Sequence, residues 1–314
     1  MKIVMMGAGG VGGLFGARLA LAGFEVGFVA RGAQLAAMRE RGLTVENAQH
    51  GNIHLAAVRV SDDPAALGPA DLVIVSVKLW DTEAAARAIR PLVGPATGVL
   101  SLQNGVVKDV MLRRELGEAA VMGGVSYVAA HIARPGAIHQ TGAMQRVVLG
   151  EYDGRKSARA EFLQQALLRA GVQAELSHDV RRAIWEKYVF LASLSAATAT
   201  MRRPVGAIRE NAQARAFLLD LMREVVAVGR AHGVSLADDF AEDRLAFADG
   251  LPADMTSSMH HDLERGNRLE VTWLSGGVVQ LGEAVGVPTP AHRAVCAILA
   301  LDADGRSATS DPPR

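Results

Sequence analysis

A glycine-rich motif near the start of the chain strongly limits the folds that this sequence can adopt. Gly7, Gly9 and Gly12 form a G-x-G-x-x-G pattern that directly follows the apolar run 2–6 and opens a stretch with apolar residues at helical spacing. Such glycines permit a tight turn and let the backbone approach a pyrophosphate at the helix N-terminus. The pattern therefore predicts the strand, loop and helix of a dinucleotide-binding domain. We expect the loop residues to contact the cofactor: Gly7, Ala8, Gly9, Gly10, Val11 and Gly12.

The next apolar run, 25–30, indicates which dinucleotide is bound. It ends at Arg31, 19 positions after Gly12. An acidic residue at this point accepts a hydrogen bond from the ribose 2′-hydroxyl of NAD, whereas an arginine favours the 2′-phosphate of NADP. The sequence therefore predicts NADPH as the cofactor.

The composition restricts the class of protein and its surroundings. The 314 residues are 50% hydrophobic, and 33 basic residues balance 33 acidic ones. This length allows two domains with substantial cores, and the balanced charge gives no reason to expect a nucleic-acid or membrane partner. The only cysteine, Cys296, lies in the apolar run 294–299, so we expect a buried structural thiol. With no internal disulfide and no apolar segment of membrane-spanning length, we expect a cytoplasmic protein.

The pattern of apolar runs changes along the chain. Nearly continuous apolar runs alternating with helical patterns predict a parallel sheet covered on both faces: 2–6, 25–30, 71–77 and 98–102. Further strands are expected as a hairpin within 43–60 and as antiparallel additions at 119–132, 137–140 and 146–150. Helical spacing then predominates, at 158–170, 180–200, 211–232, 238–248, 254–265 and 270–285.

This division predicts an α/β fold in two domains. A Rossmann-type doubly wound sheet with antiparallel additions would occupy 1–177, an all-helical domain 178–301, and a disordered polar tail 302–314. Ligands of open α/β sheets bind beyond the carboxyl ends of the strands. We therefore expect the site in a cleft between the domains.

Polar residues at strand ends and on the helices are the candidates for the chemistry. Lys78, Gln103 and Asn104 follow the runs 71–77 and 98–102, where an amide or ammonium group can hydrogen-bond a carboxamide or carbonyl. Lys187 lies on the apolar side of the 180–200 helix, and Glu270 opens the 270–285 helix. Spacing alone favours structural roles, with Lys187 as a lysine whose stem packs on the core and Glu270 as an acid that complements the helix dipole. The adjacent residues His260 and His261 point in different directions on a helix, so no metal site is expected.

Taken together, these motifs resemble the ketopantoate reductase (2-dehydropantoate 2-reductase) family of the 6-phosphogluconate dehydrogenase-like superfamily. The resemblance covers about 1–300 and rests on the following residues: the glycine motif, Arg31, Lys78-Leu79-Trp80, Gln103-Asn104-Gly105, Trp185-x-Lys187, Thr256-Ser257-Ser258-Met259-x-x-Asp262, Glu270, Gly276 and Val287-Pro288-Thr289-Pro290. It implies NADPH-dependent reduction of a small 2-keto acid, most simply ketopantoate to pantoate.

The resemblance also implies a role for individual residues. Lys187 would protonate the carbonyl oxygen, Glu270 would hold the substrate hydroxyl and orient the lysine, and Ser258 would contact the substrate carboxylate. Lys78 and Asn104 match positions beside the nicotinamide and the substrate, and Gln103 matches a cofactor contact.

One departure from the family pattern keeps the substrate open. Leu191 and Ser195 stand where pantoate-forming members carry asparagines that contact substrate. A leucine side chain cannot form a hydrogen bond, so a more apolar carbonyl or imine substrate is an alternative. A third hypothesis is a non-catalytic NADP(H)-binding regulator, against which the presence of both Lys187 and Glu270 argues. A homodimer is the default assembly.

Overall fold

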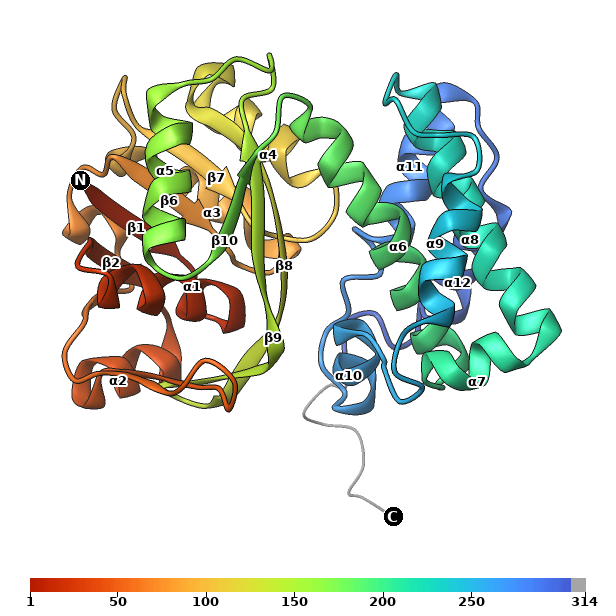
Figure 1. Cartoon of the computed structure of the whole chain (residues 1–314), viewed down its shortest axis with the longest axis horizontal. Coiled ribbons are helices and arrows are strands. Elements are labelled where there is room, and N and C mark those ends of the chain that lie inside the picture. The colour runs from red at the N-terminus through yellow and green to blue at the C-terminus, as the bar shows by residue number, and fades with distance from the viewer. Residues whose placement is uncertain (306–314) are drawn as a thin grey trace. The chain divides into compact units, whose positions relative to one another are not determined.

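The computed structural model describes residues 1–305, and it divides into two compact units (Figure 1). Unit 1 comprises Met1–Asn104 and Lys108–Ala183. Unit 2 comprises Gly105–Val107 and the chain from Ile184 onward. The expected boundary at 177 precedes α6 (Val180–Met201), whose first residues, up to Ala183, belong to unit 1.

The centre of unit 1 is a parallel sheet in the order β5-β2-β1-β6-β7. Its strands are β1 (Lys2–Met6), β2 (Glu25–Val29), β5 (Arg59–Ser61), β6 (Leu72–Val75) and β7 (Gly98–Ser101). The helices that follow these strands are α1 (Gly10–Leu21), α2 (Gly32–Arg41), α3 (Thr82–Ala88) and α4 (Lys108–Leu116). The order reverses at β1, which lies between β2 and β6, so the carboxyl ends of these strands form the edge at which ligands of such sheets bind.

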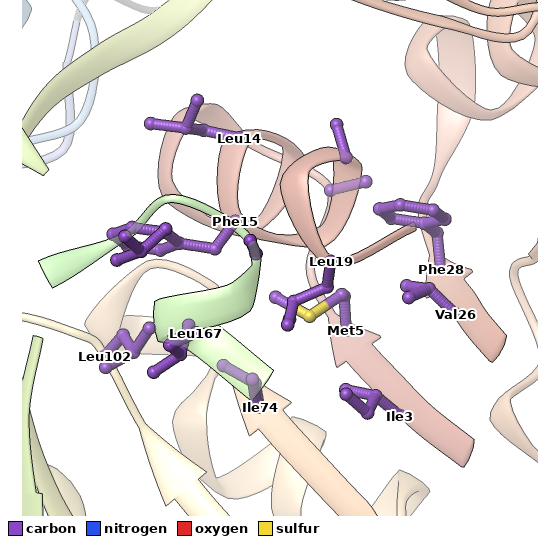
Figure 2. Packing of buried hydrophobic residues seen from close by; sticks show 14 of the residues in the cluster. Ile3, Met5, Leu14, Phe15, Leu19, Val26, Phe28, Ile74, Leu102 and Leu167 are labelled. Atoms are coloured by element: carbon purple, nitrogen blue, oxygen red, sulfur yellow. The ribbon is translucent and has the colours of Figure 1, made fainter. Parts of the chain in front are cut away.

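Both faces of the parallel sheet are buried, which explains its nearly continuous apolar sequence. Ile3 and Met5 of β1 point into one core with residues of α1 and of α5 (Ala158–Arg169). Val4, between them, points into a second core with residues of α3 and α4. Figure 2 shows the first core, where Leu19 of α1 lies beside Met5.

A long antiparallel hairpin extends the sheet. It pairs β8 (Val121–Arg134) with β9 (Ala137–Gly150), and β8 also runs parallel to β7. β9 pairs in turn with β3 (Leu43–Glu46) and β10 (Gln173–Leu176), and β3 pairs with β4 (Ile53–Leu55).

The structure corrects the expected strands of this region in two respects. The separate strands expected at 137–140 and 146–150 are one strand, because the chain bulges after Thr141, with Gly142 at φ 70°, and then resumes the same ladder. β5 and β10 were not predicted. Both are short edge strands that form by backbone pairing, and their half-exposed side chains leave little apolar signal.

Unit 2 is helical, apart from turns and loops. It contains most of α6 together with α7 (Val205–Glu210), α8 (Ala212–Ala231), α9 (Phe240–Asp249), α10 (Ser258–Glu264), α11 (Ser275–Val285) and α12 (Pro290–Ile298). α7 and α12 were not predicted. None of the helices within residues 1–305 is long and apolar enough to cross a membrane.

Three further expectations about the C-terminal region need correction. The helix expected at 270–285 begins only at Ser275, because Leu274 has a ψ of −83° and the residues before it form turns. Cys296 is half-buried rather than buried, because α12 exposes one side of the apolar run. The tail expected from 302 onward is hydrogen-bonded at its start, where the Leu269 N–H donates to the Ala303 oxygen at 2.9 Å. Residues 306–314 of that tail lie outside the described part of the chain.

Candidate functional site

The glycine loop lies at the junction of three parallel strands of unit 1. Gly7 follows β1 with a φ of 106°, a conformation that L side chains rarely adopt. Its N–H donates to the Val29 oxygen of β2 at 3.2 Å, and its oxygen accepts from the Ser76 hydroxyl, just beyond β6, at 2.8 Å. The loop is therefore fixed where the strand order reverses.

The glycines of this loop lack side chains for different reasons. A Cβ on Gly12 would lie 2.0 Å from the Gly7 oxygen, and one on Gly10 would lie 2.2 Å from the Ala130 oxygen of β8. Packing of α1 against the sheet therefore excludes side chains at Gly10 and Gly12. A Cβ on Gly9, in contrast, would meet no atom of the described chain within 4 Å apart from those of its two neighbours in sequence. The space beside Gly9 is open, as required where a ligand approaches the backbone.

The start of α1 has the electrostatic character of an anion site. Gly9 is the N-cap residue, with a φ of −79°, and the first turn of the helix contains no acidic residue. The first N–H groups of a helix lack partners within the helix, and its dipole favours a negative charge there. The open space at Gly9 and this helix end together fit a dinucleotide pyrophosphate.

The structure brings Arg31 close to the segment that follows β6. Arg31 is the N-cap residue of α2, and its side chain is 72% exposed. Its Nη2 donates to Asp81 Oδ2 at 2.6 Å, and Asp81 ends the 3₁₀ turn Leu79–Asp81. Lys78 precedes this turn, with its Nζ 5.7 Å from the centre of the Trp80 ring. Two of the predicted cofactor contacts, Arg31 and Lys78, thus belong to one edge of the sheet.

Gln103 has both ends of its side-chain amide bonded within unit 1. Its Nε2 donates to the Thr82 hydroxyl at 2.7 Å, and its Oε1 accepts from the Ser101 hydroxyl at 2.9 Å. The side chain is buried and ties the end of β7 to the start of α3. Asn104, the next residue, is half-buried.

Sequence reasoning missed a buried charged group, Lys108, that supports the end of β7 and the segment after it. Lys108, at the start of α4, is 1% exposed, and its Nζ donates to the oxygens of Ser101 and Gly124, each at 3.0 Å. The Asp109 carboxylate lies 3.0 Å from the same Nζ and accepts from the Tyr152 hydroxyl at 2.6 Å. Burial lowers the pKa of Lys108 and raises that of Tyr152. No sequence signal marked it, because an adjacent lysine and aspartate are usually exposed in folded proteins.

In unit 2, α6 carries several candidate residues on one face. Lys187, Leu191, Ser195 and Thr198 are spaced by three or four residues, so their side chains lie along the same side of the helix. Lys187 and Leu191 are half-buried, whereas Ser195 is 1% exposed.

The segment 257–260 packs against this face of α6. The Ser257 hydroxyl lies 2.9 Å from the Thr198 hydroxyl and also caps α10 by accepting from the His260 N–H at 3.0 Å. Ser258, the predicted substrate contact, is exposed at the first position of α10.

Glu270 lies in the turn that is tied to α6. Glu270 is 7% exposed, and its backbone oxygen accepts from the Leu274 N–H at 2.9 Å. The Leu274 oxygen accepts from the Tyr188 hydroxyl at 2.6 Å. Burial raises the pKa of Tyr188, so this hydroxyl stays protonated and can donate. The residue next to Lys187 thereby anchors the turn that carries Glu270.

Comparison with known proteins identifies the family. The family model described as ketopantoate reductase PanE/ApbA matches residues 3–154, and the model of its C-terminal region matches residues 179–302. The chain belongs to the ketopantoate reductase family. The predicted resemblance is thus confirmed.

Individual relatives match nearly the whole chain. A 2-dehydropantoate 2-reductase of Mesorhizobium japonicum is 32% identical over 95% of this chain and 97% of its own length. One of Archaeoglobus fulgidus is 34% identical over 93% and 94%. The crystal structure of a PanE/ApbA family ketopantoate reductase from Ralstonia eutropha is 37% identical, covers 96% of this chain and 98% of its own, and has a TM-score of 0.87.

Membership of the ketopantoate reductase family establishes the class of reaction. The protein is an oxidoreductase that acts on a CH–OH group and depends on a pyridine nucleotide. The predicted fold class is confirmed as well, with the mixed α/β sheet followed by helices.

Proposed function

We propose that this protein reduces 2-dehydropantoate to pantoate with NADPH. The observation that carries the proposal is the match of both family models, which extends over the nucleotide-binding region and the helical region alike. The open space at Gly9 supports the nucleotide assignment. NADPH, when bound, supplies the hydride.

Residues of unit 1 would hold the cofactor. In this assignment the backbone from Gly7 to Gly12 receives the pyrophosphate, and the exposed Arg31 guanidinium receives the 2′-phosphate. Lys78 and Asn104 would contact the nicotinamide and the substrate. For Gln103 we propose a contact through its backbone, because its side-chain amide is bonded to Thr82 and Ser101.

Residues of unit 2 would manage the proton and the substrate. We assign Lys187 as the general acid, because a lysine side chain ordinarily carries a proton at neutral pH and can donate it to a developing alkoxide. We assign Glu270 to the substrate hydroxyl and to the orientation of Lys187. The exposed Ser258 would bind the substrate carboxylate.

A second candidate follows from the face of α6 that carries Lys187. Leu191 lies one turn further along that face, where it offers a half-buried apolar surface. The alternative substrate is a 2-keto acid, or a related carbonyl or imine, with a more apolar side chain than ketopantoate. A protein that binds NADPH but turns over none of these compounds would be a non-catalytic regulator.

The first test measures NADPH oxidation at 340 nm with ketopantoate and a panel of 2-keto acids of increasing apolar size. We expect ketopantoate to be reduced with the highest kcat/KM, and with NADPH preferred over NADH. If the protein binds NADPH but does not turn over ketopantoate, the assignment of ketopantoate as the substrate is refuted. The 2-keto acid panel would then identify which compound is reduced.

The second test addresses the proton source. Lys187→Ala should lower kcat by about 100-fold or more, the usual contribution of a general acid, while the Kd for NADPH changes less than about twofold. Lys156→Ala, which removes an exposed lysine from a loop of unit 1, is the matched control and should keep wild-type kcat. Undiminished turnover by Lys187→Ala would refute the assignment.

The proposal also includes a homodimer located in the cytoplasm. Among homo-oligomeric proteins, two-fold dimers are the commonest assemblies. Light scattering of the purified protein and fractionation of cells test the two statements separately.

A further inference from the structure

The guanidinium assigned to the 2′-phosphate already has an anionic partner in unit 1. Arg31 Nη2 lies 2.6 Å from Asp81 Oδ2, and the Asp81 side chain is 27% exposed. The two residues come from different strand ends, since Arg31 follows β2 and Asp81 lies in the turn after β6. An acid and a base therefore share the position at which NAD and NADP sites normally differ.

The Asp81 carboxylate is not needed to hold its own segment together. Asp81 is the N-cap residue of α3, but within the described chain its side chain makes no capping bond. The turn is fixed by other groups: the Asp81 N–H donates to the Lys78 oxygen at 2.9 Å, and the Thr82 hydroxyl donates to the Leu79 oxygen at 2.7 Å. The contact that the carboxylate makes with Arg31 is therefore the feature to be explained.

We propose that Asp81 is a specificity-determining residue that limits the preference for NADPH over NADH. This inference rests on the proposed function, because it takes Arg31 as the 2′-phosphate ligand. A 2′-phosphate has to compete with the Asp81 carboxylate for the Arg31 guanidinium and is repelled by the carboxylate charge. The 2′-hydroxyl of NADH is not repelled, and Asp81 can accept its hydrogen bond. Asp81 thus replaces, from the segment after β6, the acid that NAD sites carry at the end of β2.

The test is the Kd of each nucleotide, measured by fluorescence titration in the absence of keto acid. Asp81→Asn should bind NADPH about fivefold more tightly, the scale of a lost like-charge contact at an exposed site, and NADH about twofold more weakly. The ratio of the Kd for NADH to the Kd for NADPH should therefore rise about tenfold. Added salt should reduce this gain, since the interaction is between exposed charges.

Two control variants separate the local effect from a general change of charge. Asp81→Glu retains the carboxylate and should keep the Kd ratio near that of the wild type. Glu25→Gln removes an acid from an ion pair of the same kind, with Arg59 at 3.1 Å, but at the opposite end of β2. This variant should leave both Kd values unchanged.

The outcomes distinguish the inference from the function on which it rests. An unchanged or lowered Kd ratio in Asp81→Asn overturns the role of Asp81, and a lowered ratio would mean that the carboxylate positions Arg31 for the phosphate. Arg31→Ala tests the underlying assignment and should lower the ratio at least tenfold. If Arg31→Ala has no effect, the 2′-phosphate assignment fails and the inference fails with it.

Discussion

Gly9 and Gly12 have different surroundings, and replacing each with alanine separates nucleotide binding from folding. Gly9→Ala places a methyl group in open space, whereas Gly12→Ala places one 2.0 Å from the Gly7 oxygen and 2.1 Å from the Ser76 hydroxyl. Gly9→Ala should therefore impair the approach of a pyrophosphate without disturbing the fold. Gly12→Ala should disturb the fold first.

The stability changes can be estimated from the local structure. Gly9 has a φ of −79°, which alanine adopts without strain, so the variant loses less chain entropy on folding, a gain of about 0.4–1 kcal/mol. Alanine is a poorer N-cap than glycine, which costs about 0.5–1 kcal/mol and offsets this gain. The net change should be within about 1 kcal/mol of zero, or about 2–4 °C in Tm. Gly12→Ala overpacks a filled site and should cost about 1–3 kcal/mol.

For nucleotide binding, Gly9→Ala should be the more harmful of the two substitutions, which is the reverse of their order in stability. We expect Gly9→Ala to weaken NADPH at least tenfold, about 1.4 kcal/mol, because the pyrophosphate can no longer reach the backbone N–H groups. Calorimetric titration gives the Kd, and thermal unfolding of the same samples gives Tm. Gly94→Ala is the control, since its Cβ would meet only Thr97 Oγ1 at 3.8 Å, an ordinary contact. Wild-type affinity in Gly9→Ala would refute the placement of the pyrophosphate.

Three further predictions concern buried groups. Tyr188→Phe should lower the free energy of unfolding by about 1 kcal/mol, measured by urea denaturation, because the Leu274 oxygen loses one donor but still accepts a helical N–H; an unchanged stability would contradict this. Lys108→Met should cost about 3–5 kcal/mol in the same assay, because it leaves the Asp109 carboxylate buried without its cation, and a cost below 1 kcal/mol would argue against the buried pair. Burial lowers the pKa of His292 from 6.5 to about 4, so the unfolded state binds more protons between these values. About 3 kcal/mol of the free energy of unfolding, fully present above pH 6.5, should therefore be lost as the pH falls to 4. Over the same pH range, the free energy of unfolding of His292→Gln should fall correspondingly less than that of the wild type.

Several parts of the fold could be predicted because their signals are local. The strands around the glycine motif were expected within a few residues of their observed ends, since buried parallel strands are apolar at nearly every position. α6 and α8 were expected for the same kind of reason, as long segments with apolar residues at helical spacing. The edge strand β10 escaped prediction because its sequence, Gln173–Leu176, becomes a strand only by pairing with β9.

The candidate site shows the same division between local and distant effects. The glycine motif and Arg31 are adjacent to their own strands, so the sequence was sufficient to propose them. The contact between Arg31 and Asp81 joins residues 50 positions apart and depends on β2 and β6 flanking β1. The helix expected to begin at Glu270 begins instead at Ser275.

Residue type and short-range spacing were enough to identify the family, the glycine-rich motif and the order of most elements, because all three are local properties of the chain. Which of the loop glycines has open space beside it depends on packing between distant parts of the chain, since Gly10 and Gly12 face backbone atoms and Gly9 does not. Packing also places a buried lysine, Lys108, against the end of β7, and an acid, Asp81, against Arg31. Such contacts depend on groups that folding brings together from distant strands, and no pattern of neighbouring residues encodes them.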